Sequence, residues 1–289
     1  GNSIRVPYVG DLEGDCLPEV VAGSREYNEV YILDGQTGQT KFTINSYNTS
    51  AGVSGNLAIA DVDSDGWGDI FISTTNDNPS NSAHRLVRYE YDGNGGYVER
   101  FISQERIGPY DNYDQGNGRR YHNMAISLAD INGDGAPEAV VGNQIFNALT
   151  GELITRGGAA NSTGSQRAWV SGRDIGNIAS YTVLADVLPT SFCALCDGLE
   201  LVAGNMVYAI FIPPGGGANS GTMQVAVDMS QRIEDGFVSV ADVNFDGNLD
   251  VVTARGSRPA HNYRVSVWSP IEERVYDEEV FFQNGAIGI

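Results

Sequence analysis

Residues 57–73 read LAIADVDSDGWGDIFIS, an apolar stretch followed by an acidic loop and a second apolar stretch. Positions 1, 3, 5, 7 and 9 of the loop are Asp61, Asp63, Asp65, Trp67 and Asp69. Alternate carboxylates of a tightly turned loop point into one cavity, the carbonyl at position 7 joins them, and glycine at position 6 permits the turn. Because so many hard oxygen ligands select calcium, and because the carboxylates repel one another without a cation, the loop predicts a calcium site.

The same plan recurs along the chain. The first aspartates of five such loops lie 50, 69, 56 and 56 residues apart, and a period of about 55 residues matches one four-stranded blade. We place the starts of the repeat units near residues 4, 55, 123, 180 and 236. The other four segments read VPYVGDLEGDCLPEVVAG (6–23), AISLADINGDGAPEAVVG (125–142), YTVLADVLPTSFCALCDGLELVAG (181–204) and VSVADVNFDGNLDVVTA (238–254).

Between the loops, short alternating runs such as VYILDG and RLVRYEY are separated by turn-forming residues, and 36 glycines fit many tight reversals. No stretch of helical length keeps a 3.6-residue period. An all-β array must protect its strand edges, and radial closure does so. We therefore predict one domain, residues 1–289, folded as a β-propeller of four-stranded blades. Five repeats are visible, and six or seven blades fit if the chain is a fragment. The N-terminal strand is also a candidate to complete the last blade.

Three further loops carry the ligand pattern. Two have Asn at position 3 and are predicted to bind calcium, whereas the loop at 11–19 has a longer Glu there and Cys16 in place of glycine, which predicts a weaker or distorted site. An EF-hand or dockerin loop would need an acid at position 12 and flanking helices, but here the acid comes at position 9 and strands follow. Positions 1, 3, 5, 7 and 9 are Asp130, Asn132, Asp134, Ala136 and Glu138; Asp242, Asn244, Asp246, Asn248 and Asp250; and Asp11, Glu13, Asp15, Leu17 and Glu19.

The fourth unit departs from this pattern. Asp186 is followed by an insertion that contains Cys193 and Cys196, and Glu200 alone matches the closing acid. We expect this loop to have lost its metal. The two cysteines are interpreted as a local disulfide or as two plain thiols, because the surrounding sequence lacks the strand-to-helix context of a redox motif.

The loop D-x-[DN]-x-D-G-x-x-[DE] between two strands resembles the FG-GAP/VCBS repeat of integrin-α-type β-propellers. The units, including YRVSVWSP and LELVAGNMVYAI, also resemble propeller regions of secreted surface proteins of Bacteroidetes. The resemblance implies that calcium is structural and that ligands bind to loops elsewhere on the disc. It also implies a secreted or cell-surface protein, with other domains in a larger chain.

Composition excludes several functions. A formal charge of −20 and a single lysine, Lys41, disfavour nucleic acid and anionic membrane surfaces as partners, and no apolar stretch is long enough to insert into a membrane as a helix. The three histidines, His84, His122 and His261, lack metalloprotease spacing, and no nucleophile elbow, phosphate loop or dinucleotide fingerprint occurs. We therefore expect no catalytic residues.

One segment, GPYDNYDQGNGRRYH (108–122), is a candidate recognition loop. Its tyrosines can stack on sugar rings and its arginines can pair with carboxylates, although an ordinary surface loop explains it as well. The residues concerned are Tyr110, Tyr113, Arg119, Arg120 and Tyr121.

The sequence thus favours a calcium-binding extracellular propeller that recognises a glycan or an extracellular protein. Two alternatives stay open. One is a polysaccharide lyase of the rhamnogalacturonan-lyase type, in which calcium neutralises a uronate carboxylate. The other is a structural spacer in a large surface protein.

Overall fold

The structure is a computed structural model that describes residues 7–23, 29–45, 57–75, 84–107, 125–157, 182–233, 236–257 and 262–282. Within these ranges the regular structure consists of strands alone, arranged in five four-stranded sheets. Each sheet is an antiparallel meander whose strands pair in chain order. This confirms the predicted all-β propeller with one blade for each repeat.

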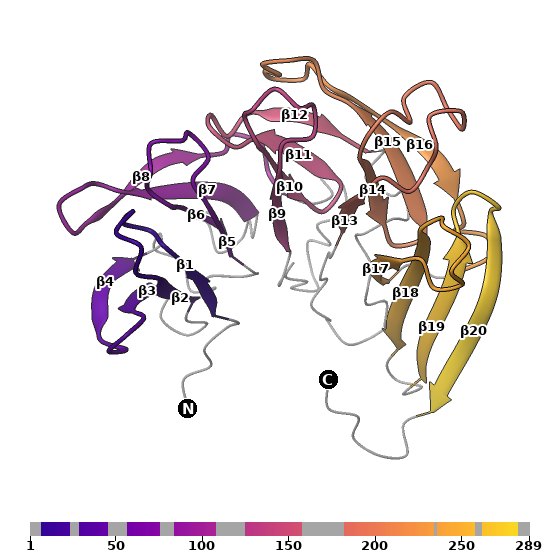
Figure 1. Ribbon diagram of the computed structural model, residues 1–289, viewed down its shortest axis with the longest axis horizontal. Coiled ribbons are helices and arrows are strands. Elements are labelled where there is room, and N and C mark those ends of the chain that lie inside the picture. Colours follow the sequence, from indigo (N-terminus) through magenta and orange to yellow (C-terminus); the bar gives the residue numbers. More distant parts are fainter. Residues whose placement is uncertain are drawn as a thin grey trace, which may run out of the picture.

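The strands follow one another in five groups of four. Figure 1 shows the blades arranged around a common centre, with the first strand of each blade innermost. The bounds are β1 (Tyr8–Gly10), β2 (Glu19–Gly23), β3 (Glu29–Asp34) and β4 (Thr40–Asn45) in blade 1; β5 (Ala58–Ala60), β6 (Asp69–Thr75), β7 (His84–Tyr91) and β8 (Tyr97–Ile102) in blade 2; β9 (Ile126–Ala129), β10 (Glu138–Val141), β11 (Gln144–Asn147) and β12 (Leu153–Arg156) in blade 3; β13 (Val183–Ala185), β14 (Glu200–Ala203), β15 (Met206–Phe211) and β16 (Thr222–Asp228) in blade 4; and β17 (Phe237–Ala241), β18 (Asp250–Ser257), β19 (Asn262–Ser269) and β20 (Arg274–Phe282) in blade 5.

The suggestion that the N-terminal strand completes the last blade is wrong. The strand β1 pairs with β2 of its own blade, Tyr8 opposite Val21 and Gly10 opposite Glu19, and blade 5 already has four strands of its own. The physical reason is local: only the short acidic loop separates β1 from β2, so their pairing has a small loop-closure cost.

Hydrophobic cores lie between successive blades. In β6, Ile70 and Ile72 face the core shared with blade 1, whereas Phe71 faces the core shared with blade 3. Two further clusters join blades 3 and 4 and blades 4 and 5. Because both faces of such a strand are buried, its sequence is a continuous apolar run rather than an alternating one.

The acidic loops occupy equivalent places, since each joins the innermost strand of a blade to the second strand. Neighbouring blades are also linked by hydrogen bonds. The Gly68 N–H donates to the Leu12 carbonyl at 3.0 Å, and the hydroxyls of Thr182 and Thr253 donate to the carbonyls of Gly142 and Gly204. The fold therefore presents the loops as a series on one edge of the blades. The described residues include no apolar helix of membrane-spanning length.

Candidate metal sites in the acidic loops

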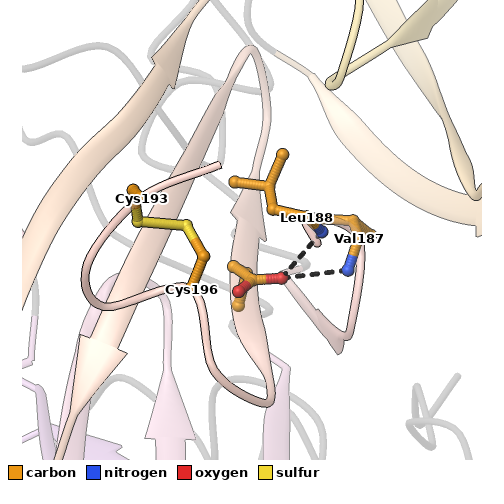
Figure 2. The surroundings of a disulfide bond; sticks show 5 residues. Val187, Leu188, Cys193 and Cys196 are labelled. Atoms are coloured by element: carbon orange, nitrogen blue, oxygen red, sulfur yellow. Dashed lines mark hydrogen bonds between the residues drawn. A yellow bond between two sulfur atoms is a disulfide. The ribbon is translucent and has the colours of Figure 1, made fainter. Parts of the chain in front are cut away.

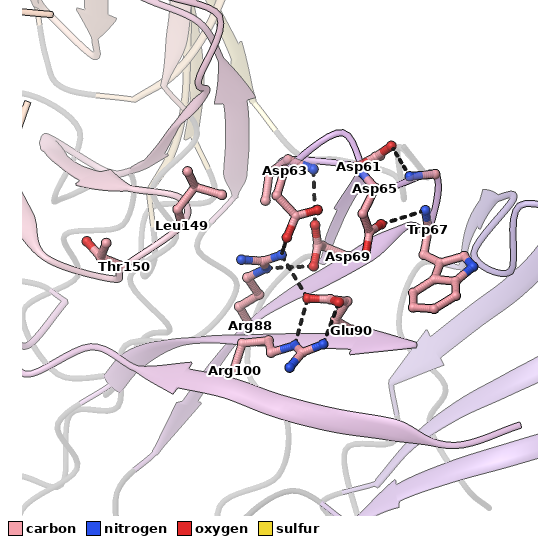
Figure 3. A network of polar contacts seen from close by, with 12 residues as sticks. Asp61, Asp63, Asp65, Trp67, Asp69, Arg88, Glu90, Arg100, Leu149 and Thr150 are labelled. Carbon is pink, nitrogen blue, oxygen red and sulfur yellow. Dashed lines mark hydrogen bonds and ion pairs between the residues drawn. The ribbon is translucent and has the colours of Figure 1, made fainter. Parts of the chain in front are cut away.

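The loop between β5 and β6 brings three carboxylates together. Oxygen atoms of Asp61, Asp63 and Asp65 all lie within 4.8 Å of one another, and the three side chains are exposed (Figure 3). The Asp61 carboxylate accepts hydrogen bonds from the N–H groups of Asp65 and Gly66, at 3.2 and 3.0 Å. Asp65 in turn accepts one from the Trp67 N–H at 2.8 Å. The turn is therefore closed by its own carboxylates, and further oxygens remain for a cation.

The same scaffold is built in three other blades. In each, the carboxylate at position 1 accepts from the N–H groups of positions 5 and 6, and the carboxylate at position 5 accepts from the N–H of position 7. The position-1 acceptors are Asp11, Asp130 and Asp242, and the position-7 donors are Leu17, Ala136 and Asn248. The structure thus holds all four predicted loops in one backbone arrangement.

The closing acid, which stands at position 9 in loops 1, 2, 3 and 5 and is Glu200 in the longer fourth loop, has a role that the sequence did not reveal. In every blade it is buried and accepts a hydrogen bond from the backbone N–H of position 2, as Asp69 does from Val62 at 3.0 Å. This contact ties the start of the loop to the strand that follows it. The other closing acids are Glu19, Glu138, Glu200 and Asp250, which accept from Leu12, Ile131, Val187 and Val243.

The environment of the closing acids favours a cation nearby. Burial raises the pKa of Asp69 to about 6 and that of Glu138 to about 7, although each carboxylate accepts a backbone hydrogen bond that acts in the opposite direction. Burial also raises the pKa of Asp250, whose Oδ1 is buried without a hydrogen-bond partner. A divalent cation in the loop would stabilise these carboxylates in their charged form. The donor set of carboxylate and amide oxygens therefore fits a hard divalent cation.

Position 3 divides the four loops into two pairs. In loops 3 and 5 the amides of Asn132 and Asn244 donate to the position-5 carboxylate at 2.9 and 2.8 Å, and each also donates to a neutral oxygen outside the loop, the Pro213 carbonyl or the Tyr276 hydroxyl. In loops 1 and 2 the position-3 carboxylate pairs instead with a cation of the blade. Lys41 Nζ lies 2.8 Å from Glu13 and 2.9 Å from Glu19. Arg88 contacts Asp63 and Asp69, both at 2.6 Å.

The fourth loop is held by other means. Cys193 and Cys196 form a disulfide within the loop (Figure 2). Leu188 and Cys196 are buried in the core shared by blades 4 and 5, and Phe192 and Leu195 pack against that core. Glu200 accepts from both the Val187 and Leu188 N–H groups, at 2.9 and 3.1 Å. Of the two readings of the cysteines, the structure therefore has the disulfide.

The candidate recognition loop, with Tyr110, Tyr113, Arg119, Arg120 and Tyr121, lies outside the described residues. Sequence reasoning missed Lys41, Arg88 and the adjoining pair of Glu90 and Arg100. The number of residues between a closing acid and the third strand of its blade differs from blade to blade. The position of Arg88 beside the second loop can therefore be recognised only once the strand register is known.

Residues 11–72, which span the first two acidic loops, match the profile of the FG-GAP-like repeat. No curated protein matches the sequence significantly. Among solved structures, the biofilm matrix protein Bap1 of V. cholerae is similar with a TM-score of 0.54 and 18% identity, over 96% of this chain and 40% of Bap1. The rhamnogalacturonan lyase YesW is similar with a TM-score of 0.59 and 14% identity, over 95% of this chain and 50% of YesW. The chain thus spans half or less of each protein, and at these identities the likeness shows the fold.

Proposed function

We propose that this chain, an FG-GAP-type β-propeller, binds calcium in the acidic loops of blades 1, 2, 3 and 5 and serves as a non-catalytic recognition module outside the cell. One observation carries the proposal: four loops share the same carboxylate-closed scaffold, and in the second loop three carboxylates converge within 4.8 Å. The backbone hydrogen bonds of the second loop leave carboxylate oxygens of Asp63, Asp65 and Asp69 available, and a cation can bind them.

In this proposal calcium stiffens the disc rather than acting on a substrate. Each loop connects the innermost strand of a blade to the next, so that a bound ion fixes the edge along which the blades meet. The ion binds the folded loop and not the unfolded chain, and it therefore stabilises the fold by mass action.

An extracellular location is supported by three features. The similarity to a biofilm matrix protein, the disulfide between Cys193 and Cys196, and the strongly acidic composition all suit a secreted or surface-exposed protein. Millimolar calcium outside cells would also fill loops of moderate affinity, since extracellular calcium modules bind in that range.

The partner proposed for the module is a glycan or an extracellular protein. Binding of the purified chain to an array of glycans and matrix proteins, in calcium and again in EGTA, tests this proposal. A hit that appears only in calcium supports the recognition module. A folded, calcium-loaded chain that binds nothing points to a structural spacer.

The lyase alternative is tested separately, because a lyase releases unsaturated products that absorb in the ultraviolet. Incubation of the chain with pectic polysaccharides in calcium should give no rise in absorbance. A rise that requires the folded chain would replace the recognition module with an enzyme. Calcium binding itself is tested by thermal melting, where an unchanged melting temperature in EGTA contradicts it.

A further inference from the structure

Arg88 occupies a position that is apolar in every other blade. The strand register places each residue two after the closing acid opposite a residue of the third strand, and in blade 2 this pair is Phe71 and Arg88. The residues equivalent to Arg88 are Ile32, Ile145, Val207 and Val267. A buried guanidinium in such a position is costly unless acids pair with it. Its presence in this blade therefore calls for an explanation in terms of those acids.

The contacts of Arg88 point to the second acidic loop. Its side chain is 5% exposed, and it reaches Asp63 through Nη2 and Asp69 through Nε, both at 2.6 Å (Figure 3). Nη2 also lies 2.9 Å from Glu90, which pairs in turn with Arg100 at 2.6 Å. Arg88 thus bridges positions 3 and 9 of the loop, while Arg100 compensates the charge of Glu90.

The bridge from Arg88 reduces the net negative charge of the second loop. Loop 2 has four carboxylates at its ligand positions and Arg88 beside them, which leaves a net charge of −3. Loop 1 reaches the same value with four carboxylates and Lys41. Loops 3 and 5 have Asn at position 3 and three carboxylates, and among the described residues no lysine or arginine pairs with them. An acid at position 3 therefore accompanies a cation supplied by the blade.

We propose that Arg88 limits the metal affinity of the second loop. It pairs with Asp63 and Asp69 in the metal-free loop, where an incoming ion competes with it for their oxygens, and it lowers the charge of the loop to that of loops 3 and 5. The metal-free loop is then stable, and its affinity is held near that of its neighbours. This inference rests on the proposed calcium binding and concerns how one site is tuned.

The test compares four proteins with three loop charges by terbium luminescence, because terbium replaces calcium at oxygen sites and Trp67 at position 7 can sensitise it. Trp67→Phe assigns the signal to this loop. Arg88→Ile, which leaves a charge of −4, should bind terbium about tenfold more tightly than the wild type, and Asp63→Asn, which leaves −2, about tenfold more weakly. The double variant restores −3 and should return to within about threefold of the wild type.

Two controls separate the charge of Arg88 from general effects. Arg88→Lys keeps the charge and should stay within about threefold of the wild type. Arg100→Met removes a charge that pairs with Glu90 and not with a ligand of the loop among the described residues, and it should also stay within about threefold. Arg88→Met, closer to arginine in length, replaces Arg88→Ile if the isoleucine variant does not fold. In EGTA, Arg88→Ile and Arg88→Met should have lower melting temperatures than the wild type. Calcium should reduce this difference in melting temperature.

The outcomes separate the two proposals. A wild-type chain that binds neither terbium nor calcium overturns the proposed function. A wild-type chain that binds both, with unchanged or weaker affinity in the neutral Arg88 variants, overturns the role of Arg88 alone. The same holds if the double variant binds terbium no more tightly than Asp63→Asn alone, because removal of Arg88 then has no effect on affinity.

Discussion

The second and fourth loops occupy the same place in their blades, yet different interactions stabilise them. The second loop is exposed and charged, with three carboxylates converging on one point. The fourth loop is closed by a disulfide and packs Leu188 and Cys196 into a core. Both keep the buried closing acid, Asp69 in one and Glu200 in the other, bonded to the backbone at the start of the loop. The closing acid is therefore a requirement of the blade, and the carboxylate cluster is an addition to it.

The largest expected difference comes from the first aspartate of each loop. Asp61→Ala removes the acceptor of two backbone N–H groups and a ligand of the proposed ion, so we expect a loss of about 3–4 kcal/mol in excess calcium. Asp186→Ala changes an exposed residue of a loop with no proposed ion, and should cost less than about 0.5 kcal/mol. Urea unfolding of both variants measures the difference. Equal losses of unfolding free energy in the two variants would mean that the same interactions stabilise both loops.

The second prediction concerns the disulfide that closes the fourth loop. The bond closes a loop of four residues, for which the chain-entropy account gives about 2 kcal/mol, and we expect Cys193→Ser with Cys196→Ser to lose that amount. The loss should be the same in calcium and in EGTA, because no ion is proposed at this loop. A loss that grows in EGTA would show that the fourth loop supports the calcium sites.

Glu200 should make the stability of blade 4 depend on pH. Burial raises the pKa of this carboxyl, Asp186 adds to the increase, and the hydrogen bonds from Val187 and Leu188 oppose it. Since the pKa is higher in the folded state, the stabilisation is fully present below the ordinary pKa of a glutamate, near 4.5, and is lost as the pH rises through the raised value.

Glu200→Gln keeps an oxygen acceptor and cannot ionise. Above the raised pKa it should therefore be the more stable protein, by on the order of 1 kcal/mol, because the wild-type carboxylate has a buried oxygen without a partner. Unfolding curves at constant calcium from pH 4.5 upward test this, with the gap between the two proteins opening only at higher pH. A gap that is constant with pH would rule out ionisation of Glu200 as its cause.

Features set by local sequence were predictable, whereas features set by strand register were not. The blades and the ligand positions of loop 2 were predicted because a repeated nine-residue pattern depends on local geometry, in which alternate residues of a turn share one side. The cations Lys41 and Arg88 were not predicted, because they reach the loops from β4 and β7 and depend on strand register. The hydrogen bond that the closing acid accepts from the backbone was not predicted for a different reason. An acidic side chain at this position suits a metal ligand and a backbone acceptor equally well.

The smallest expected effect isolates backbone strain at position 6, where loops 1 and 2 differ. Gly66 has a φ of 94°, and nothing lies within 4 Å of the place where a Cβ would stand, whereas Cys16 adopts a φ of 65° as a non-glycine residue. Gly66→Ala should therefore cost about 1 kcal/mol through conformation alone. Cys16→Gly should gain less than that, about 0.5 kcal/mol, because glycine also makes the unfolded chain more flexible. Chemical unfolding in EGTA measures both changes without a contribution from calcium, and Cys16→Ser controls for loss of the thiol. If Cys16→Gly also tightens calcium binding at loop 1, strain at position 6 is what weakens that loop; if stability rises while affinity stays the same, the weakness comes from Glu13 and its pairing with Lys41.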